Sequence, residues 1–378
     1  MGIELAQSAV MALLGKGYYM WQIPRCDGGD PARIVARATA AGLSHVLIKI
    51  ADGGYWDYNV DKEREIDLIP PVLSALKQAG VQVWGWHYVR GDEPMVEAQR
   101  AIKRIGELGV DGYVIDAEHE YRDRSKAKAA GLFMEQLRKH FPDLPIALSS
   151  YRFPRTHSAL PFEVFMAACD YAMPQVYFEQ AHNPEEQLQR CVDQYMGLTN
   201  TRPIIPTGPT YVRGDWKPTP AEIQRFLAKA KELGLPAANA WSWDFATRDP
   251  YLPLFEAVAT FDWPFTPPIA DMPERLIGRL NQHDAGHVAG LYLEEAAHVT
   301  GARTVVGQSE VESWYREMFR QILPQGTFEF TGKVSQGNTR IFTWKATSSS
   351  GQVLDGNDTL SVRDGRILYH YTYFTLRS

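Results

Sequence analysis

The sequence predicts an α/β chain with two folded parts: a closed (β/α)8 barrel over residues 1–263 and a smaller, cone-shaped α+β domain over residues 274–378. Three observations predict this fold. Short apolar runs alternate with helical patterns eight times in the first part, which is typical of a parallel sheet closed into a barrel. Residues 264–273 contain four prolines and predict a stiff linker. After this linker, two helical patterns come first and long alternating strands follow.

Each barrel unit is predicted from an apolar run and the amphipathic stretch after it. The strands are expected at residues 17–23, 45–51, 81–88, 112–118, 146–151, 171–177, 203–211 and 238–243. The helices are expected at residues 31–41, 69–79, 95–108, 124–140, 184–198, 219–233 and 252–260. A doubly wound open sheet would need a glycine-rich phosphate turn after the first strand. The segment QIPRCDGGD has no such spacing, which favours the barrel.

The last hundred residues predict helices at 274–295 and 310–322. Antiparallel strands are expected at 327–334, 339–348, 352–363 and 366–377. Turn dipeptides separate them at Gln336-Gly337, Ser350-Gly351 and Asp364-Gly365. Helices followed by a curved meander indicate an α+β domain.

Bulk composition excludes several classes of protein. The net charge of −6 argues against a nucleic-acid partner, and no apolar run approaches the roughly 20 residues that a membrane span needs. The three cysteines have neither metal-ligand nor disulfide spacing, so we expect a reducing compartment and neither a metal nor a cofactor. The first residues lack the basic region of a signal peptide, which predicts a cytoplasmic location and leaves open export by another route.

The chemistry is expected at the carboxyl ends of the barrel strands, and the fourth strand carries the strongest signal. Its sequence, VDGYVIDAEHE, ends with Asp116 and Glu118. Residues two apart on a strand point to one face, about 7 Å apart. Two carboxyl groups at this distance repel each other when both are ionised, so one of them should have a raised pKa. A carboxyl group with a raised pKa suits proton donation to a glycosidic oxygen. A salt-bridged pair on a loop, with Lys49 as the partner, is the competing interpretation.

Other predicted strand ends supply the groups that a sugar site needs. Aromatic faces stack on the apolar side of a pyranose, and amides and acids bind its hydroxyls. The aromatic and histidine candidates are Trp21, Trp86, His87, Tyr88, Tyr151, Tyr177, Trp241 and Trp243. The polar candidates for substrate binding are Lys49, Gln175 and Asp244. Some of the tryptophans are expected to fill the core instead.

Several short motifs in the barrel resemble glycoside hydrolases. DGYVIDAE, MPQVY and WSWD are similar to segments of family 18 chitinase-like TIM barrels. LIKIADG, WHY and the Asp-x-Glu pair also resemble family 25 lysozyme-type enzymes. The family 18 resemblance implies Glu118 as general acid, and Asp116, assisted by Tyr177, as the group that orients an acetamido substituent. It implies Trp241 as the floor of a sugar subsite.

The C-terminal segments 272–301, 307–319 and 360–374 resemble SnoaL-like and ketosteroid-isomerase-like domains of the nuclear transport factor 2 (NTF2) superfamily. Such cones hold an apolar pocket, and some of them transfer a proton next to a carbonyl group. The resemblance implies Asp358 and His370 as the residues of that pocket, and a homodimer formed through the sheet.

Three hypotheses follow. The first is a glycoside hydrolase that acts on a polysaccharide, N-acetylated ones included, with the cone as an accessory binding or dimerisation domain. The second is a barrel that binds a carbohydrate or another small molecule without turnover. The third is a SnoaL-type cyclase or isomerase in which the barrel is secondary.

Overall fold

The computed structural model describes residues 13–263, 272–336, 338–363 and 366–377. The chain divides into two compact units, Met1–Pro268 and Ile269–Ser378. Most of the predicted linker, the chain start considered as a signal peptide, and the predicted turn residues Gly337, Asp364 and Gly365 lie outside the described residues. No helix within the described ranges is long and apolar enough to cross a membrane.

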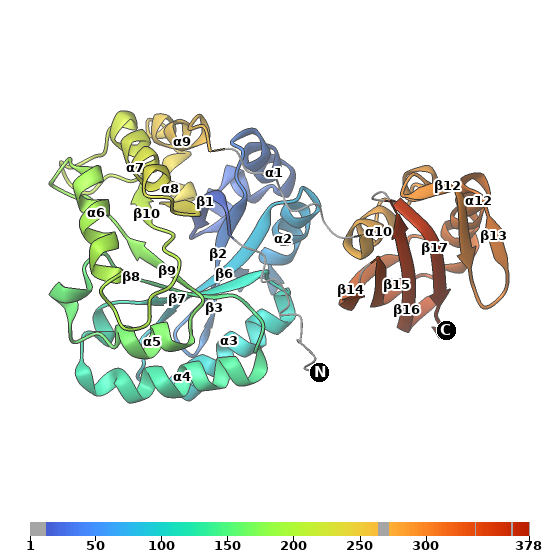
Figure 1. The fold of residues 1–378 in the computed structure, drawn as a ribbon, viewed down its shortest axis with the longest axis horizontal. Coiled ribbons are helices and arrows are strands. Elements are labelled where there is room, and N and C mark those ends of the chain that lie inside the picture. The colour runs from blue at the N-terminus through green and yellow to red at the C-terminus, as the bar shows by residue number, and fades with distance from the viewer. Residues whose placement is uncertain (1–12, 264–271, 337, 364–365, 378) are drawn as a thin grey trace, which may run out of the picture. The chain divides into compact units, whose positions relative to one another are not determined.

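The first unit is a closed barrel of eight parallel strands, as the sequence predicted (Figure 1). The strands are β1 (Gly15–Met20), β2 (His45–Asp52), β6 (Gln82–Val89), β7 (Gly112–Ala117), β8 (Ile146–Tyr151), β9 (Tyr171–Gln175), β10 (Thr207–Pro209) and β11 (Ala237–Trp241). The barrel is closed by β1, which pairs in parallel with both β2 and β11. Three short strands lie in the segment that connects β2 to the next helix: β3 (Trp56–Asp57), β4 (Val60–Asp61) and β5 (Ile66–Asp67).

Helices surround the strands of this unit (Figure 1). They are α1 (Pro31–Ala40), α2 (Ile69–Gln78), α3 (Pro94–Leu108), α4 (Ala127–His140), α5 (Phe162–Ala168), α6 (Pro184–Tyr195), α7 (Pro220–Glu232), α8 (Trp243–Ala246) and α9 (Leu252–Ala259). Two of them begin at strong caps. The Asp30 side chain accepts the N–H groups of the first turn of α1, and Thr219 with Glu222 forms a capping box at α7.

Several predicted strands are shorter in the structure, most of all the one at 203–211. The run at 203–211 yields only β10, because Pro203, Pro206 and Pro209 have no N–H to donate to a neighbouring strand. The eighth strand ends at Trp241, and α8 begins two residues later. The chain therefore turns into a helix where the sequence predicted the strand to continue.

Alternation along the strands sorts the barrel's apolar residues into two layers. Inward-facing side chains such as Trp84, Trp86 and Met173 form a cluster inside the barrel. Outward-facing residues such as Ile48, Ile50 and others pack against the surrounding helices in a larger core. This alternation decides which residues at a strand end reach the rim pocket and which lie under a helix.

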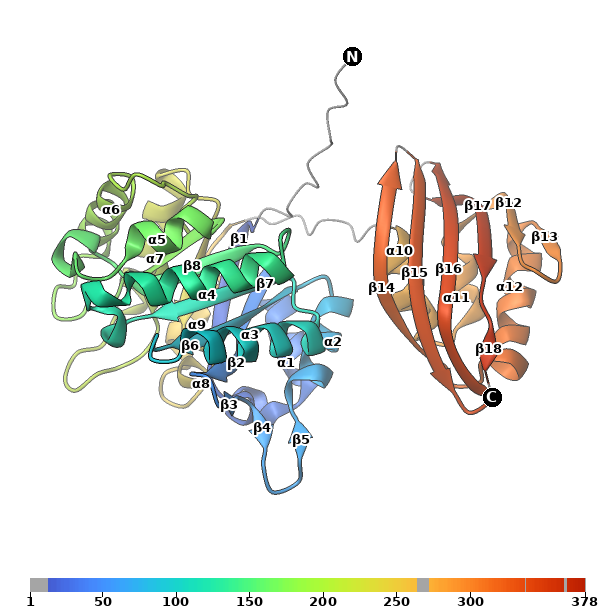
Figure 2. The same ribbon diagram turned by 90° about the horizontal axis from the view of Figure 1, so that it is seen from below.

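The second unit is the predicted α+β domain. Its helices are α10 (Met272–Leu280), α11 (Ala285–Ala289) and α12 (Gln308–Glu317), which continues as a π-helical turn over Met318–Ile322. Its strands are β12 (Tyr292–Val299), β13 (Thr304–Val306), β14 (Thr327–Gln336), β15 (Thr339–Ser348), β16 (Gly351–Arg363), β17 (Arg366–Tyr373) and β18 (Leu376–Arg377). The sheet order is β13-β12-β17-β16-β15-β14, and Figure 2 shows the long strands β14 to β17 side by side with the helices on one face.

The predicted helix at 274–295 is wrong in its second half. The new short helix α11 begins after Asp284, which caps it by accepting the N–H of His287, and it ends at Ala289. Residues Tyr292–Val299 then form β12, which pairs in parallel with β17. Their buried positions, Tyr292, Ala296 and His298, face the domain core. The sequence analysis therefore missed a whole strand, and His298 with it.

Candidate active site

A cavity of about 600 Å³ opens among the carboxyl ends of the barrel strands. Nine residues that the sequence predicted as catalytic or substrate-binding line it. They are Trp21, Lys49, Trp86, Asp116, Glu118, Tyr151, Gln175, Tyr177 and Trp241. Alternation explains why they meet, because each lies on an inward-facing position of a strand or directly after a strand end.

Two carboxylates share one amide donor in this pocket. Gln175, the last residue of β9, places its Nε2 3.0 Å from Asp116 Oδ1 and 2.8 Å from Glu118 Oε1. The same nitrogen lies 3.3 Å from the hydroxyl of Ser149, which is aligned with Asp116 on the neighbouring strand β8. The amide holds the two acids close together and offsets part of their mutual repulsion.

The surroundings of Asp116 favour the protonated form of its carboxyl group. Asp116 is only 6% exposed, and burial raises its pKa well above the ordinary value. The neighbouring Glu118 carboxylate raises that pKa further, while the positive charge of Lys49 opposes the shift. The sequence predicted a raised pKa for one of the two acids, and the structure assigns it to Asp116.

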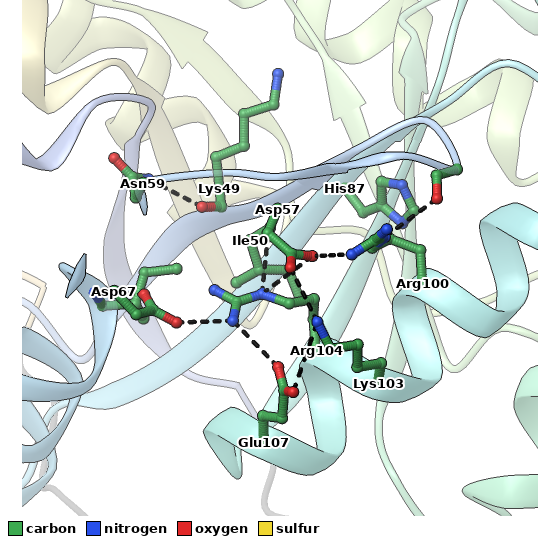
Figure 3. A network of polar contacts seen from close by, with 12 residues as sticks. Lys49, Ile50, Asp57, Asn59, Asp67, His87, Arg100, Lys103, Arg104 and Glu107 are labelled. Atoms are coloured by element: carbon green, nitrogen blue, oxygen red, sulfur yellow. Dashed lines mark hydrogen bonds and ion pairs between the residues drawn. The ribbon is translucent and has the colours of Figure 1, made fainter. Parts of the chain in front are cut away.

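Lys49 does not form a salt bridge with the acid pair. Its ammonium lies 2.6 Å from Asp52 Oδ2, and it also lies over the rings of Tyr58 (4.3 Å) and Trp86 (4.7 Å). Figure 3 shows the Lys49 side chain pointing away from the polar network around Arg104. The competing interpretation of a salt-bridged pair with Lys49 as the partner is therefore wrong.

Aromatic rings form a continuous wall around Trp241. The Trp241 ring lies 5.3 Å from Trp86, 5.5 Å from Tyr19 and 6.4 Å from Trp21, measured between ring centroids. Trp86 is held in place by donating its indole N–H to the carbonyl of Met20 at 3.1 Å. Trp241 is partly exposed at the centre of this wall, where a flat apolar face can meet a ligand.

Tyr177 lies on the same face of the chain as Gln175. Its ring meets the edge of Tyr211 at a centroid distance of 5.4 Å. Burial, followed by Tyr211 and the acid pair, raises the pKa of Tyr177 well above its ordinary value. The phenol therefore stays protonated and can donate a hydrogen bond into the pocket.

Two predicted substrate-binding residues do not line this pocket. His87 is fully buried on the outer face of β6, with its ring nitrogens 2.8 Å from Tyr113 Oη and 2.9 Å from the Gly53 carbonyl. Burial lowers its pKa to about 4, so it is a neutral structural histidine. Asp244 is buried on α8, where it accepts the backbone N–H of Trp21 at 3.1 Å. It supports the pocket through that backbone. Trp243, expected at the rim, is buried in the outer core.

Several lining residues were missed from the sequence. They are Tyr19, Ser149, Arg152, Phe153, Thr156, His157, Glu179, Tyr211 and Arg213. Tyr88, which the sequence analysis named as a rim aromatic, also lines the pocket. Spacing by two would have found some of them. Tyr19 precedes Trp21 by two residues, and Ser149 precedes Tyr151 by two, so each pair shares a face.

In the C-terminal domain, Asp358 and His370 do come together. His370 Nε2 lies 2.8 Å from Asp358 Oδ2, and Trp344 donates its indole N–H to Asp358 Oδ1 at 2.9 Å. The hydroxyl of Thr372 also donates to Asp358 Oδ1. On the other side of the imidazole, His370 Nδ1 lies 2.6 Å from the hydroxyl of Tyr292. The two predicted residues are thus the centre of a polar cluster.

This cluster is closed to solvent. Asp358 is 2% exposed and His370 is 1% exposed. His298 stacks on His370 at 4.3 Å, and neither of its ring nitrogens has a hydrogen-bond partner among the described residues. The family resemblance implied that both residues line an apolar pocket, whereas the structure buries both side chains in the core of the domain.

The predicted dimer stays a prediction. The sheet presents exposed apolar side chains from several strands. They are Val334, Ile341, Leu354, Tyr369, Tyr371 and Tyr373. Within the described ranges, no group of three or more His, Cys, Asp or Glu side chains is arranged to hold a metal ion.

Comparison with known proteins identifies the class of the second domain. Residues 274–370 match the family model of the SnoaL-like domain. Solved structures similar to the chain include an NTF2-like protein of unknown function from Cytophaga hutchinsonii (12% identity, 27% of this chain and 86% of that chain, TM-score 0.24). Another is a putative ketosteroid isomerase from Kribbella flavida (15% identity, 28% of this chain and 76% of that chain, TM-score 0.25).

No curated protein matches the chain. The sheet topology and the family match together describe a closed parallel barrel joined to a SnoaL-like domain. The resemblance of the barrel to glycoside hydrolases stays a prediction.

Proposed function

We propose that the protein is a glycoside hydrolase whose active site is the rim pocket of the barrel, with a polysaccharide as substrate. The observation that carries the proposal is the pair Asp116 and Glu118 bridged by Gln175 in an open cavity. One buried acid with a raised pKa beside a second, more exposed one is the arrangement that general acid catalysis of glycoside cleavage requires. The aromatic wall around Trp241 supplies the surface for a sugar ring.

In the proposed reaction, the proton that the pair holds on Asp116 passes to Glu118, which gives it to the glycosidic oxygen as the bond to the anomeric carbon breaks. On an N-acetylated sugar the acetamido oxygen attacks that carbon, and Asp116 and the Tyr177 hydroxyl orient the acetamido group. Water then opens the cyclic intermediate and returns the proton to Glu118. Gln175 holds the two carboxyl groups in place throughout the reaction, because its amide nitrogen donates hydrogen bonds to both.

The test is hydrolysis of a panel of polysaccharides and chromogenic glycosides by Glu118→Gln. We expect the rate to fall at least about 100-fold, the lower end of what a general acid contributes, with Tm nearly unchanged because the amide fills the same space. Glu120→Gln is the matched control, because Glu120 lies two residues away and does not line the pocket, and a glutamine there can still accept the hydroxyl of Tyr88. Absence of hydrolysis by the wild-type protein across the panel would contradict the proposal and favour the second hypothesis, binding without turnover.

A SnoaL-type cyclase or isomerase is the other candidate. The observation in its favour is the match of residues 274–370, within which the Asp358–His370–Tyr292 chain of hydrogen bonds could carry a proton. Its burial is the argument against it, since a substrate carbonyl must reach the proton-transferring group. Retention of all activity by Asp358→Asn would rule it out.

A further inference from the structure

The rim pocket contains one cation that its described neighbours leave unpaired. Lys49 is paired with Asp52, and Arg213 Nη1 lies 3.0 Å from Glu179 Oε2. Glu179 also accepts the hydroxyl of Tyr211, so its oxygens are occupied. Arg152 lines the same pocket, but no described side chain or carbonyl forms a hydrogen bond or ion pair with its guanidinium.

The fold places Arg152 in the lining of the rim pocket, at the end of β8. It directly follows β8, whose last residue, Tyr151, is aligned with Gln175 on β9. The guanidinium carbon lies 5.0 Å from the centroid of the Phe153 ring, and Arg190 covers the same ring at 4.1 Å. Arg152 is partly buried, and its pKa is lowered, chiefly by burial. An arginine stays charged at any physiological pH, so this position holds an incompletely solvated positive charge.

A second group with spare hydrogen-bonding capacity lines the same end of the pocket. The His157 ring stacks on Tyr151 at a centroid distance of 3.9 Å. Its Nδ1 is buried and has no hydrogen-bond partner among the described residues. Burial, followed by the charges of Arg122 and Arg152, lowers the pKa of His157, so the ring is neutral and can donate from one nitrogen.

We infer that the substrate carries a carboxylate, which Arg152 binds at the β8 end of the rim pocket. A planar guanidinium presents parallel N–H groups that match the two oxygens of a carboxylate. The charge of Glu179 acts on Arg152, but Glu179 forms no hydrogen bond or ion pair with it, so these N–H groups stay available to a ligand. His157 supplies an additional donor at the same end. The ligand class is therefore an acidic saccharide, in which a uronate or a carboxyl-bearing ether accompanies the sugar ring at the aromatic wall. The inference rests on the proposed function for the identity of the sugar site.

The test measures binding in full-length Glu118→Gln, so that turnover does not interfere. The probes are a hyaluronan tetrasaccharide and a tetrasaccharide of alternating N-acetylglucosamine and N-acetylmuramic acid, each paired with its carboxyl-reduced form. We expect at least one acid form to bind about 10- to 100-fold more tightly than its reduced form, as for a charged hydrogen bond. Adding Arg152→Met should bring this ratio close to one. Adding Arg190→Met should leave it unchanged, because Arg190 covers the same ring but does not line the pocket.

Equal binding of the acid and reduced forms of both probes, or a preference that survives Arg152→Met, would overturn the inference. Arg152→Gln, which keeps a polar head, gives the same comparison if the methionine variant does not fold. The two proposals can fail separately. A carboxylate preference in a protein without hydrolytic activity would sink the proposed function alone. Hydrolysis of neutral chitotetraose with no effect of Arg152 would sink this inference alone.

Discussion

The barrel and the C-terminal domain each hold a buried aspartate in a polar cluster, and the two clusters differ in access and in the groups that face the aspartate. Asp116 lies at the wall of a cavity of about 600 Å³ and faces a second carboxylate. Asp358 lies in a closed core and faces an imidazole and two neutral donors. The first arrangement holds a proton where a ligand can reach it. The second satisfies its own hydrogen bonds and is suited to holding the sheet and helices together.

The comparison teaches that an acid–base pair is no evidence of catalysis until its access is known. From the sequence, Asp116 and Glu118 carried the stronger signal, and Asp358 and His370 were candidates because they too combine groups that transfer protons. The structure separates them by burial. The variants below test this separation, beginning with the one for which we expect the largest effect.

Asp358→Leu should strongly lower the free energy of unfolding of the C-terminal domain. The substitution leaves the Trp344 indole, the Thr372 hydroxyl and His370 Nε2 without their shared acceptor in the core, which costs about 3–5 kcal/mol. Denaturant unfolding followed by tryptophan fluorescence measures it. Asp355→Leu, at an exposed carboxylate that accepts one backbone N–H, is the control and should change stability by less than about 1 kcal/mol. A similar small loss for Asp358→Leu would mean that the cluster does not stabilise the core.

Gln175→Leu should lower the hydrolytic activity of the barrel site without abolishing it. Loss of the shared donor removes a hydrogen bond to each of the two carboxyl groups, so we expect kcat/KM to fall about 10- to 100-fold, the worth of a charged hydrogen bond. The lost hydrogen bond also favoured the ionised form of Asp116, so the pH profile of kcat/KM should move to higher pH. Gln224→Leu, on the exposed side of α7, should leave both the rate and the profile unchanged. A lower rate with an unmoved profile would indicate a structural role only.

His298→Phe should make the C-terminal domain less sensitive to acid. Burial, followed by the neighbouring His370, lowers the pKa of His298 to about 2. The unfolded chain has an ordinary histidine pKa near 6.5, so this group stabilises the fold above about pH 6.5 and loses that contribution as the pH falls toward 2. Between pH 7 and pH 5 the wild-type domain should lose about 1–2 kcal/mol more than the variant. Parallel denaturation curves at the two pH values would measure this, and equal losses would contradict it.

Periodicity in the sequence was sufficient to predict the barrel and the core of the site. Asp116 and Glu118, and likewise Gln175 and Tyr177, are spaced by two and do share the inward face. The same rule argues against His87, which lies between the inward-facing Trp86 and Tyr88 and must point outward. Arg152 escaped prediction for the opposite reason. It adjoins Tyr151, yet both line the pocket, because the strand ends at Tyr151 and alternation no longer applies.

The C-terminal domain was predicted as a class but not in its details. Tyr292–Val299 contains Leu293, Glu294, Glu295 and Ala297, whose helical preference concealed a strand. Pairing with β17, a contact far away in the sequence, decides that segment. The burial of Asp358 is set by the closure of helices over the sheet, which local sequence does not encode.

The most direct measurement compares Glu118→Gln and Asp358→Leu in parallel, recording the hydrolysis rate per folded molecule and Tm for each. The account predicts that Glu118→Gln loses hydrolysis and keeps its Tm, whereas Asp358→Leu keeps hydrolysis by the folded barrel and loses at least several degrees in the Tm of its C-terminal domain. The reverse result, with activity lost in Asp358→Leu at unchanged Tm and retained in Glu118→Gln, would contradict it.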